Sequence, residues 1–224
     1  MKQLNVVISG FDHYDDVSVN PSYEVPKALA DQGLGDIGAL GDVNVAIHTV
    51  SLPVSFANAW PLLLESIEAV HADIIIATGL KHAARGVMLE RCATNLMDAA
   101  RPDIDNMTPS REPIDPEGPA AYWTRLPLRS IMRDFTRDGI PSTLSSDAGT
   151  FVCNSLFYNL LNWTSRQERV LSGFVSFPQV SATSVAGVGR HGLPLERQID
   201  ACRDVVRETI GYYLKPSSSD ILID

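Results

Sequence analysis

The chain contains 224 residues with a mass of 24.4 kDa, of which 45% are hydrophobic and 20% charged. These values suit a globular α/β chain with a full core. The formal charge of −9 and the isoelectric point near 5.0 exclude the clustered positive charge that nucleic acids and anionic membranes require. We therefore expect neither of these partners, but a small neutral or weakly polar ligand.

The apolar runs and the cysteines exclude further classes of protein. The longest apolar runs, such as residues 73–78, are strand-sized, whereas a membrane helix needs about 20 residues. The first residues enter a strand without the apolar region and cleavage site of a signal peptide, which predicts a cytoplasmic protein. Cys92, Cys153 and Cys202 are odd in number and lack metal-ligand spacing, so we expect no metal, no cofactor and no disulfide framework.

Short apolar runs alternate along the chain with amphipathic segments of helical period. Strands are predicted at residues 4–9, 43–50, 74–78, 89–96, 142–146 and 170–177. Helices are predicted at residues 22–31 (capped by Ser22), 56–69, 126–138, 153–162 and 195–213. The alternation predicts a three-layer α/β/α fold with a mostly parallel central sheet. Ligands bind at the carboxyl ends of such strands, which indicates the loops after Ser9, Thr78, Ser146 and Val175.

Two segments bear on the domain organisation. The strand at residues 89–96 would carry Glu90, Cys92 and Thr94 on one face, because side chains alternate along a strand. Residues 101–119 contain five prolines and are predicted to be an ordered surface excursion, not a domain boundary. We therefore expect one catalytic domain over residues 1–215, followed by a C-terminal tail at residues 216–224.

Cys153 is the first candidate for chemistry, because it follows a strand and a turn with glycine and should lie in the first turn of a helix. The exposed N–H groups and the helix dipole there favour a thiolate with a lowered pKa, and the same N–H groups suit an oxyanion. The alternative is a buried core cysteine, a common fate of an intracellular thiol. Placement alone leaves both possibilities open.

The residues around Cys153 form a recognisable motif. The run Asp147-Ala-Gly-Thr-Phe-Val-Cys-Asn154, followed by Phe157-Tyr158, resembles the nucleophile motif of the pyroglutamyl peptidase I family of cysteine peptidases. Further elements of that family match in the same order along nearly the whole chain, namely residues 9–14, 20–21, 79–80, 90–95, 120–122, 126–127 and 138–141. The resemblance implies a phosphorylase/hydrolase-like α/β/α fold and a homo-oligomer, for which apolar residues near Trp60 and Trp123 would supply a surface.

In that family, a Cys, a His and a Glu form a triad that removes an N-terminal pyroglutamyl (5-oxoprolyl) group from peptides. The resemblance assigns the nucleophile to Cys153 and the carboxylate to Glu90. The alternative for Glu90 is an exposed acid paired with Arg85 or Arg91. The implied substrate is a peptide or small molecule with a lactam or a similar acyl group.

The histidine of the family does not match. The segment Gly173-Phe-Val-Ser-Phe-Pro178 places Ser176 at the position of the family base. Serine does not titrate near neutral pH and cannot shuttle protons as imidazole does. His13 and His82 lie in loops at predicted carboxyl ends of strands and are candidates for a displaced base, while His191 is a weaker one. The remaining histidines, His48 and His71, are expected to be structural.

Phe11, Tyr14 and Asn20 are candidate substrate-binding residues. The two aromatic residues match family aromatics that line the pyroglutamyl pocket, where flat rings suit an uncharged lactam. Asn20 belongs to the matching Asn-Pro element. The alternative for the aromatic residues is ordinary core packing after the first strand.

Three hypotheses remain open. The first is a cysteine hydrolase of pyroglutamyl peptidase type, whose activity is weak or altered because the His base is missing. The second is an enzyme that uses Cys153 for another acyl transfer or a cyclisation. The third is a catalytically inactive homologue that binds a lactam, and this binding would survive replacement of Cys153 by alanine.

Overall fold

The computed structural model describes residues 2–12, 17, 19–37, 41–181 and 192–221. The candidate residues His13, Tyr14 and His191 lie outside these ranges. No helix in these ranges is long and apolar enough to cross a membrane.

The centre of the molecule is a sheet of six strands in the order β2-β1-β3-β8-β4-β7, and β5 and β6 form a separate pair. The strands are β1 (Lys2–Phe11), β2 (Val43–Leu52), β3 (Ile74–Leu80), β4 (Val87–Glu90), β5 (Cys92–Thr94), β6 (Ala121–Trp123), β7 (Ser142–Ser145) and β8 (Leu171–Phe177). The four strands from β2 to β8 run parallel, whereas β4 runs antiparallel to β8 and parallel to β7. The prediction of a mostly parallel sheet is confirmed.

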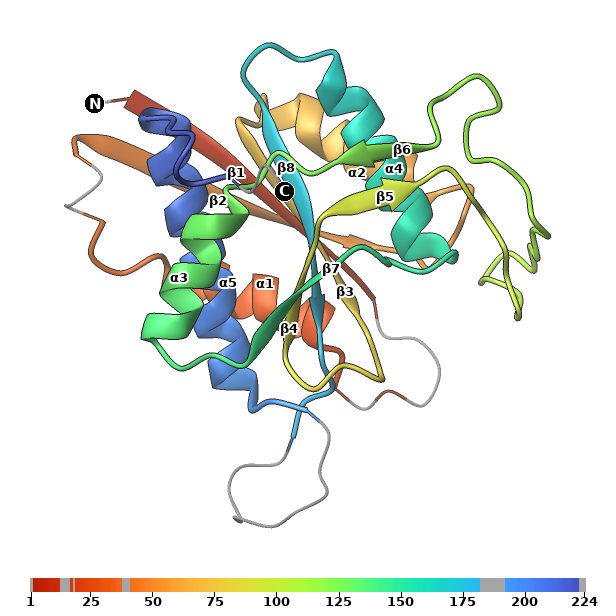
Figure 1. The fold of residues 1–224 in the computed structure, drawn as a ribbon, viewed down its shortest axis with the longest axis horizontal. Coiled ribbons are helices and arrows are strands. Elements are labelled where there is room, and N and C mark those ends of the chain that lie inside the picture. Colours follow the sequence, from red (N-terminus) through yellow and green to blue (C-terminus); the bar gives the residue numbers. More distant parts are fainter. Residues whose placement is uncertain (1, 13–16, 18, 38–40, 182–191, 222–224) are drawn as a thin grey trace.

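Helices cover both faces of this sheet (Figure 1). They are α1 (Pro21–Gln32), α2 (Ala59–Val70), α3 (Leu128–Arg137), α4 (Val152–Ser165) and α5 (Leu195–Leu214). Val6 and Ile8 of β1 pack with α1, α3 and α5, whereas Val7 between them packs with α2 and α4. This alternation is what a strand buried on both faces requires. The three-layer α/β/α architecture is therefore confirmed.

The predicted strand at residues 89–96 is two strands in two different sheets. Arg91 lies between the two strands, and its backbone bonds to both sides. Its N–H donates to the carbonyl of Ser145 over 2.7 Å, next to the large sheet, and its carbonyl accepts from the N–H of Thr124 over 2.8 Å, next to the small one. Cys92 therefore pairs with Trp123 in the small sheet, while Glu90 pairs within the large one. The expectation that Glu90, Cys92 and Thr94 share one strand face was wrong.

The proline-rich excursion is held by a buried carboxylate. Asp103 is 6% exposed and accepts hydrogen bonds from the backbone N–H groups of Phe56, Asp105 and Met107 over 2.8 to 2.9 Å. Such bonds to a charged acceptor are among the stronger ones in proteins. They fix residues 103–107 of the excursion against the loop before α2, in agreement with the predicted order.

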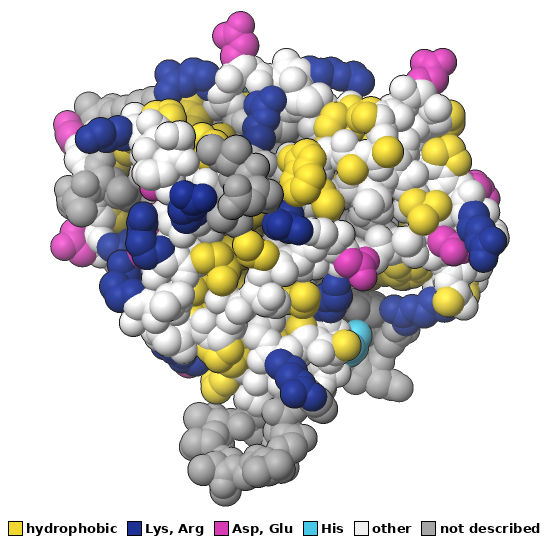
Figure 2. All heavy atoms as spheres, in the orientation of Figure 1, with side chains coloured by type: hydrophobic (Ala, Val, Ile, Leu, Met, Phe, Trp, Pro, Cys, Tyr) yellow, Lys and Arg dark blue, Asp and Glu magenta, His cyan; other side chains and the backbone are white. Residues whose placement is uncertain are grey.

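On the face seen in Figure 2, the exposed apolar side chains form separate groups and not one large patch. Basic and acidic side chains lie between these groups. Trp123 is 65% exposed, and the guanidinium of Arg91 lies 6.0 Å from the centroid of its ring. Trp60 is only partly buried. The self-association surface expected near the two tryptophans stays a prediction.

Candidate functional site

The register of the sheet brings four candidate positions onto one face. Gly79 of β3 lies opposite Ser176 of β8, and Phe174 of β8 lies opposite Glu90 of β4. Residues opposite each other in a ladder share a face, as do residues two apart in a strand. Phe174 packs against Phe157 of α4, with ring centroids 5.5 Å apart. Glu90, Ser176 and Gly79 therefore all face α4.

Cys153 stands above this group, in the first turn of α4 as the sequence predicts. A Cβ atom on Gly79 would lie 3.0 Å from the Sγ atom of Cys153 and 2.8 Å from Cζ of Phe174. The contact with the ring is shorter than real Cβ contacts, and the contact with the sulfur is tighter than most of them, so a side chain at position 79 would force Phe174 and Cys153 to shift. The thiol is partly buried over the sheet.

Burial raises the pKa of the Cys153 thiol to about 12, and the charge of Glu90 acts in the same direction. Lys81 and the backbone N–H of Cys153 itself oppose this rise. The prediction of a lowered pKa at the helix N-terminus was therefore wrong. Removing the thiolate from water costs more than the first-turn N–H groups return.

Glu90 is fully buried, so its interpretation as an exposed acid paired with Arg85 or Arg91 was wrong. The hydroxyl of Ser176 donates to its Oε1 over 2.7 Å, while Oε2 has no hydrogen-bond partner among the described residues. Burial raises the pKa of Glu90, whereas the hydroxyls of Ser145 and Ser176 and the charge of Lys81 lower it. A buried carboxylate oxygen without a partner is unusual, and it leaves one acceptor free for a ligand or water.

The loop after β7 meets the end of β3 although the two strands run in opposite directions. Nζ of Lys81 donates to the carbonyl oxygen of Asp147, in the turn before α4. β4 and β7 run against the rest of the sheet, so the predicted site does not consist of carboxyl ends alone. It forms where the end of β3 faces the turn between β7 and α4.

The described histidines lie apart from this group. His82 is exposed, and its Nδ1 lies 2.8 Å from Nε2 of Gln179. His48 lies within β2, and His71 ends α2 in the left-handed conformation with φ 51°. Among the described residues, nothing places an imidazole beside Cys153.

The two described candidates for substrate binding have structural contacts. Phe11 is 2% exposed in the core beneath α2 and α4. The fully buried Asn20 donates to the carbonyls of Phe11 and Asp12 over 3.0 and 3.1 Å. Its Oδ1 accepts from the N–H of Ser22, so Asn20 caps α1 and the prediction of a Ser22 cap was wrong. Asn20 thus fixes the start of the loop that follows β1.

Sequence reasoning missed Lys81 and Asn154. The buried Asn154, next to the cysteine, accepts from the N–H of Thr94 over 3.0 Å and donates to the carbonyls of Thr94 and Leu96 over 2.8 and 3.0 Å. It ties the first turn of α4 to β5. The signal for Lys81 was its position two residues after Gly79, which only the sheet register makes meaningful.

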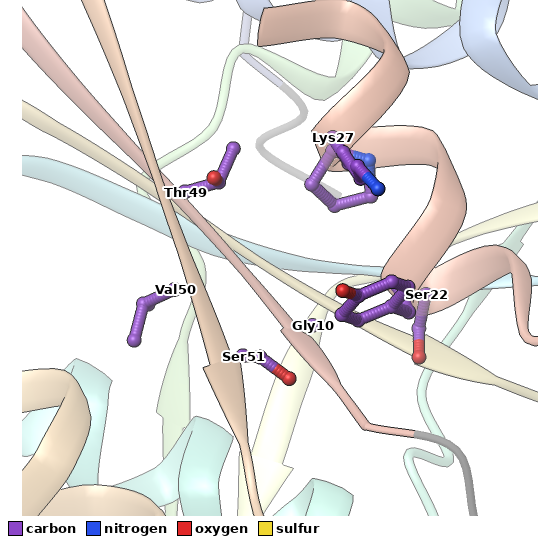
Figure 3. A pocket seen from close by; sticks show the side chains of 8 residues that line it. Gly10, Ser22, Lys27, Thr49, Val50 and Ser51 are labelled. Carbon is purple, nitrogen blue, oxygen red and sulfur yellow. The ribbon is translucent and has the colours of Figure 1, made fainter.

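Two cavities lie near the ends of the strands. One of about 450 Å³ is lined by Lys81, Arg85, Met88 and Pro141, and Met88 is the ladder partner of Ser176. The other, of about 220 Å³, lies between α1 and β2 on the opposite face of the sheet, with Lys27 among its lining residues (Figure 3). No cluster of three or more metal-ligating side chains occurs in the described ranges.

Comparison with known proteins places this geometry in context. The family model described as pyroglutamyl peptidase matches residues 4–211. The chain is similar to the pyrrolidone-carboxylate peptidase of Bacillus subtilis (strain 168), with 36% identity over 181 residues and 80% of each chain covered. It is equally similar to that of Pseudomonas fluorescens (strain SBW25), with 36% identity and 87% of each chain covered.

Solved structures agree with the sequence comparisons. The pyrrolidone carboxyl peptidase from Thermococcus litoralis superposes with a TM-score of 0.83 at 30% identity, with all of both chains covered. The pyroglutamyl peptidase I from Bacillus amyloliquefaciens gives a TM-score of 0.82 at 30% identity, again with all of both chains covered. The predicted resemblance and the predicted enzyme class are therefore confirmed.

Proposed function

The chain belongs to the pyroglutamyl peptidase family, and on that premise we propose that it removes an N-terminal pyroglutamyl group from peptides or related amides, with Cys153 as the nucleophile. One observation carries the proposal. Cys153 stands in the first turn of a helix, over a glycine that leaves room for its sulfur. The same face of the sheet holds the buried pair of Glu90 and Ser176.

The proposed reaction starts with attack of the Cys153 sulfur on the carbonyl carbon of the lactam acid. The N–H groups of the first turn of α4 have no partner within the helix, and they suit the negative charge that develops on the carbonyl oxygen. Loss of the amine leaves a thioester, which water hydrolyses. Phe11 and Tyr14 are proposed to line the lactam pocket, and Asn20 to hold their loop in place.

Because position 176 holds a serine, we expect a low rate of turnover. Loss of the general base of a nucleophilic triad typically costs several orders of magnitude. In this chain the burial that raises the pKa of Cys153 adds to that loss, because less thiolate is present at neutral pH. We therefore propose a slow pyroglutamyl peptidase whose proton transfers do not involve residue 176.

The raised pKa of Cys153 also supports the alternative of a binding homologue without turnover. Such a protein would bind a lactam through the same pocket, and its affinity would survive Cys153→Ala. The alternative of an acyl transferase or cyclase stays a prediction, and it would differ by giving thioester formation with an acceptor other than water.

The testing experiment measures release of a fluorescent amine from a pyroglutamyl amide. Wild type is compared with Cys153→Ala and with Cys202→Ala, a matched control in which a buried thiol of α5 is removed. Turnover that disappears only in Cys153→Ala supports the proposal. Absence of wild-type turnover together with lactam binding favours the binding homologue instead.

Domain organisation, location and assembly belong to the same proposal. We propose a single catalytic domain over residues 1–215 with a short tail, because both core clusters use the one central sheet. We further propose a cytoplasmic homo-oligomer. Analytical ultracentrifugation of wild type and Trp123→Glu measures the assembly state and the part that the exposed ring plays in it.

A further inference from the structure

Lys81 follows the last residue of β3 and continues the ladder by one residue. Its N–H donates to the carbonyl of Phe177 at the end of β8, over 2.8 Å. Because side chains alternate along a strand, Lys81 shares the face of Gly79, the face on which Cys153 stands. Its Nζ donates to the carbonyl oxygen of Asp147 before α4. The ammonium is thus held at the turn that leads into the nucleophile.

The charge of Lys81 acts on two ionisable groups of the site, the thiol of Cys153 and the carboxyl of Glu90. It lowers the pKa of Cys153 and of Glu90, against the effect of burial on each. Among the residues that the structure describes, Glu90 and Lys81 are the charged groups that act on the thiol, and Asp147 acts in turn on Glu90. A positive charge beside a buried thiol favours the thiolate, because it replaces part of the lost hydration.

The same side chain is open to a ligand. Lys81 lines the cavity of about 450 Å³ together with Met88, whose ladder partner is Ser176. The cavity therefore offers room for a leaving group on the side of the site where Lys81 lies. The ammonium would then lie beside the nitrogen atom that departs.

We propose that Lys81 stabilises the Cys153 thiolate and donates the proton that the leaving amine requires, and so performs the work that an imidazole at position 176 would otherwise do. The inference rests on the proposed function of the site. Lysine suits both tasks, because its amine can lose and regain a proton, whereas the guanidinium of arginine stays charged.

The proposed reaction passes through a thioester in two stages. The thiol proton leaves to solvent, and the sulfur electron pair forms the C–S bond while the carbonyl π electrons move to oxygen. On collapse the C–N bond breaks, and the departing nitrogen takes a proton from the Lys81 ammonium. The neutral amine then removes a proton from the water that attacks the thioester, the C–S bond breaks, and thiolate and ammonium are restored.

The test compares Lys81→Met and Lys81→Arg with wild type in three assays: alkylation of Cys153 by iodoacetamide, hydrolysis of pyroglutamyl-alanine, and hydrolysis of a pyroglutamyl 4-nitrophenyl ester. The ester releases a stable anion and needs no proton donor. Lys27→Met is the matched control, because it removes the same charge on the opposite face of the sheet, beside Tyr23.

Lys81→Met is expected to slow alkylation about tenfold, the effect of one pKa unit. It should slow dipeptide hydrolysis about a hundredfold or more, the usual range for a lost general acid. Lys81→Arg should keep alkylation within about twofold of wild type, since it keeps the charge, and should lose dipeptide but not ester hydrolysis. Wild-type rates for Lys81→Met in alkylation and dipeptide hydrolysis would overturn the inference.

Failure of the proposed function is visible separately. A wild type that cleaves neither substrate contradicts that function, and the alkylation rates then decide the role of Lys81. Equal alkylation of wild type and Lys81→Met overturns the inference in that case as well.

Discussion

The Oγ atom of Ser176 lies 2.7 Å from Oε1 of Glu90, so a neutral hydroxyl donates a hydrogen bond to a fully buried carboxylate. The bond supplies one donor to a group whose other oxygen has no partner among the described residues. The hydroxyl of Ser176 stabilises the ionised form of Glu90, but it cannot take up a proton near neutral pH.

Removal of that donor should destabilise the protein at neutral pH. Ser176→Ala leaves the Glu90 carboxylate without the bond, and an unsatisfied buried polar group costs about 1–3 kcal/mol, with more for a charged one. The raised pKa of Glu90 means that wild-type stability falls as pH rises above the ordinary glutamate range, because the unfolded chain releases its proton first. Ser176→Ala should raise the pKa of Glu90 further, so the fall in the free energy of unfolding, measured with urea, should extend to higher pH.

Ser172→Ala is the control for Ser176→Ala. Ser172 is a buried serine of the same strand, and its hydroxyl lies 2.8 Å from the neutral hydroxyl of Thr164. Its loss should lower the free energy of unfolding equally at all pH values. An identical pH dependence of the two variants would contradict the charge assigned to Glu90.

The reactivity of Cys153 should rise steeply with pH. Because burial raises its pKa to about 12, the thiolate fraction should increase about tenfold per pH unit beyond pH 9, where a free cysteine of pKa about 8.5 levels off. Alkylation rates by iodoacetamide, with glutathione measured alongside, check this. A plateau near neutral pH would show that the helix N-terminus outweighs burial.

Gly79→Ala should displace the side chain of Cys153. The added methyl would lie 3.0 Å from the sulfur of Cys153 and 2.8 Å from the ring of Phe174, and overpacking of this kind costs about 1–3 kcal/mol. We expect a lower melting temperature and slower alkylation of Cys153. Adding Phe174→Leu removes the contact with the ring but not that with the sulfur, so alkylation should stay slow in the double variant.

Asp204 on α5 should lower the free energy of unfolding at neutral pH. Burial and the charges of Asp138 and Asp134 raise its pKa from 3.8 to about 6. Well below pH 4, Asp204 is protonated in both the folded and the unfolded chain. Between about pH 4 and pH 6 it loses its proton in the unfolded chain first, so the free energy of unfolding falls as pH rises. Asp204→Asn should raise the free energy of unfolding at pH 7 by about 1 kcal/mol, after allowance for partial exposure.

The gain from Asp204→Asn should vanish at low pH. Glu65→Gln on α2 serves as the control, because Glu65 is exposed and its replacement removes one negative charge without removing a buried one. Denaturant unfolding at pH 4 and at pH 7 separates the two variants. A gain that is equal at both pH values would contradict the assignment.

The sequence predicted the layers and the place of Cys153 in the first turn of a helix, but not the environment of the site. Runs such as β3 are apolar because both faces are buried, which makes them visible in the sequence. The reversed direction of β4 was not visible, because it depends on how the chain crosses between strands. The raised pKa of Cys153 and the place of Lys81 depend on burial and register, which no local motif records.

The measurement that tests the central claim most directly is covalent labelling with a pyroglutamyl chloromethyl ketone, followed by peptide mass spectrometry. The protein offers three thiols, of which Cys202 is buried on the opposite face of the sheet and Cys92 is buried in the separate β5–β6 pair. We predict one adduct, on Cys153, that excess pyroglutamate slows. Labelling of Cys92 or Cys202 instead, or labelling of Cys153 that pyroglutamate leaves unchanged, would contradict a pyroglutamyl site at this cysteine.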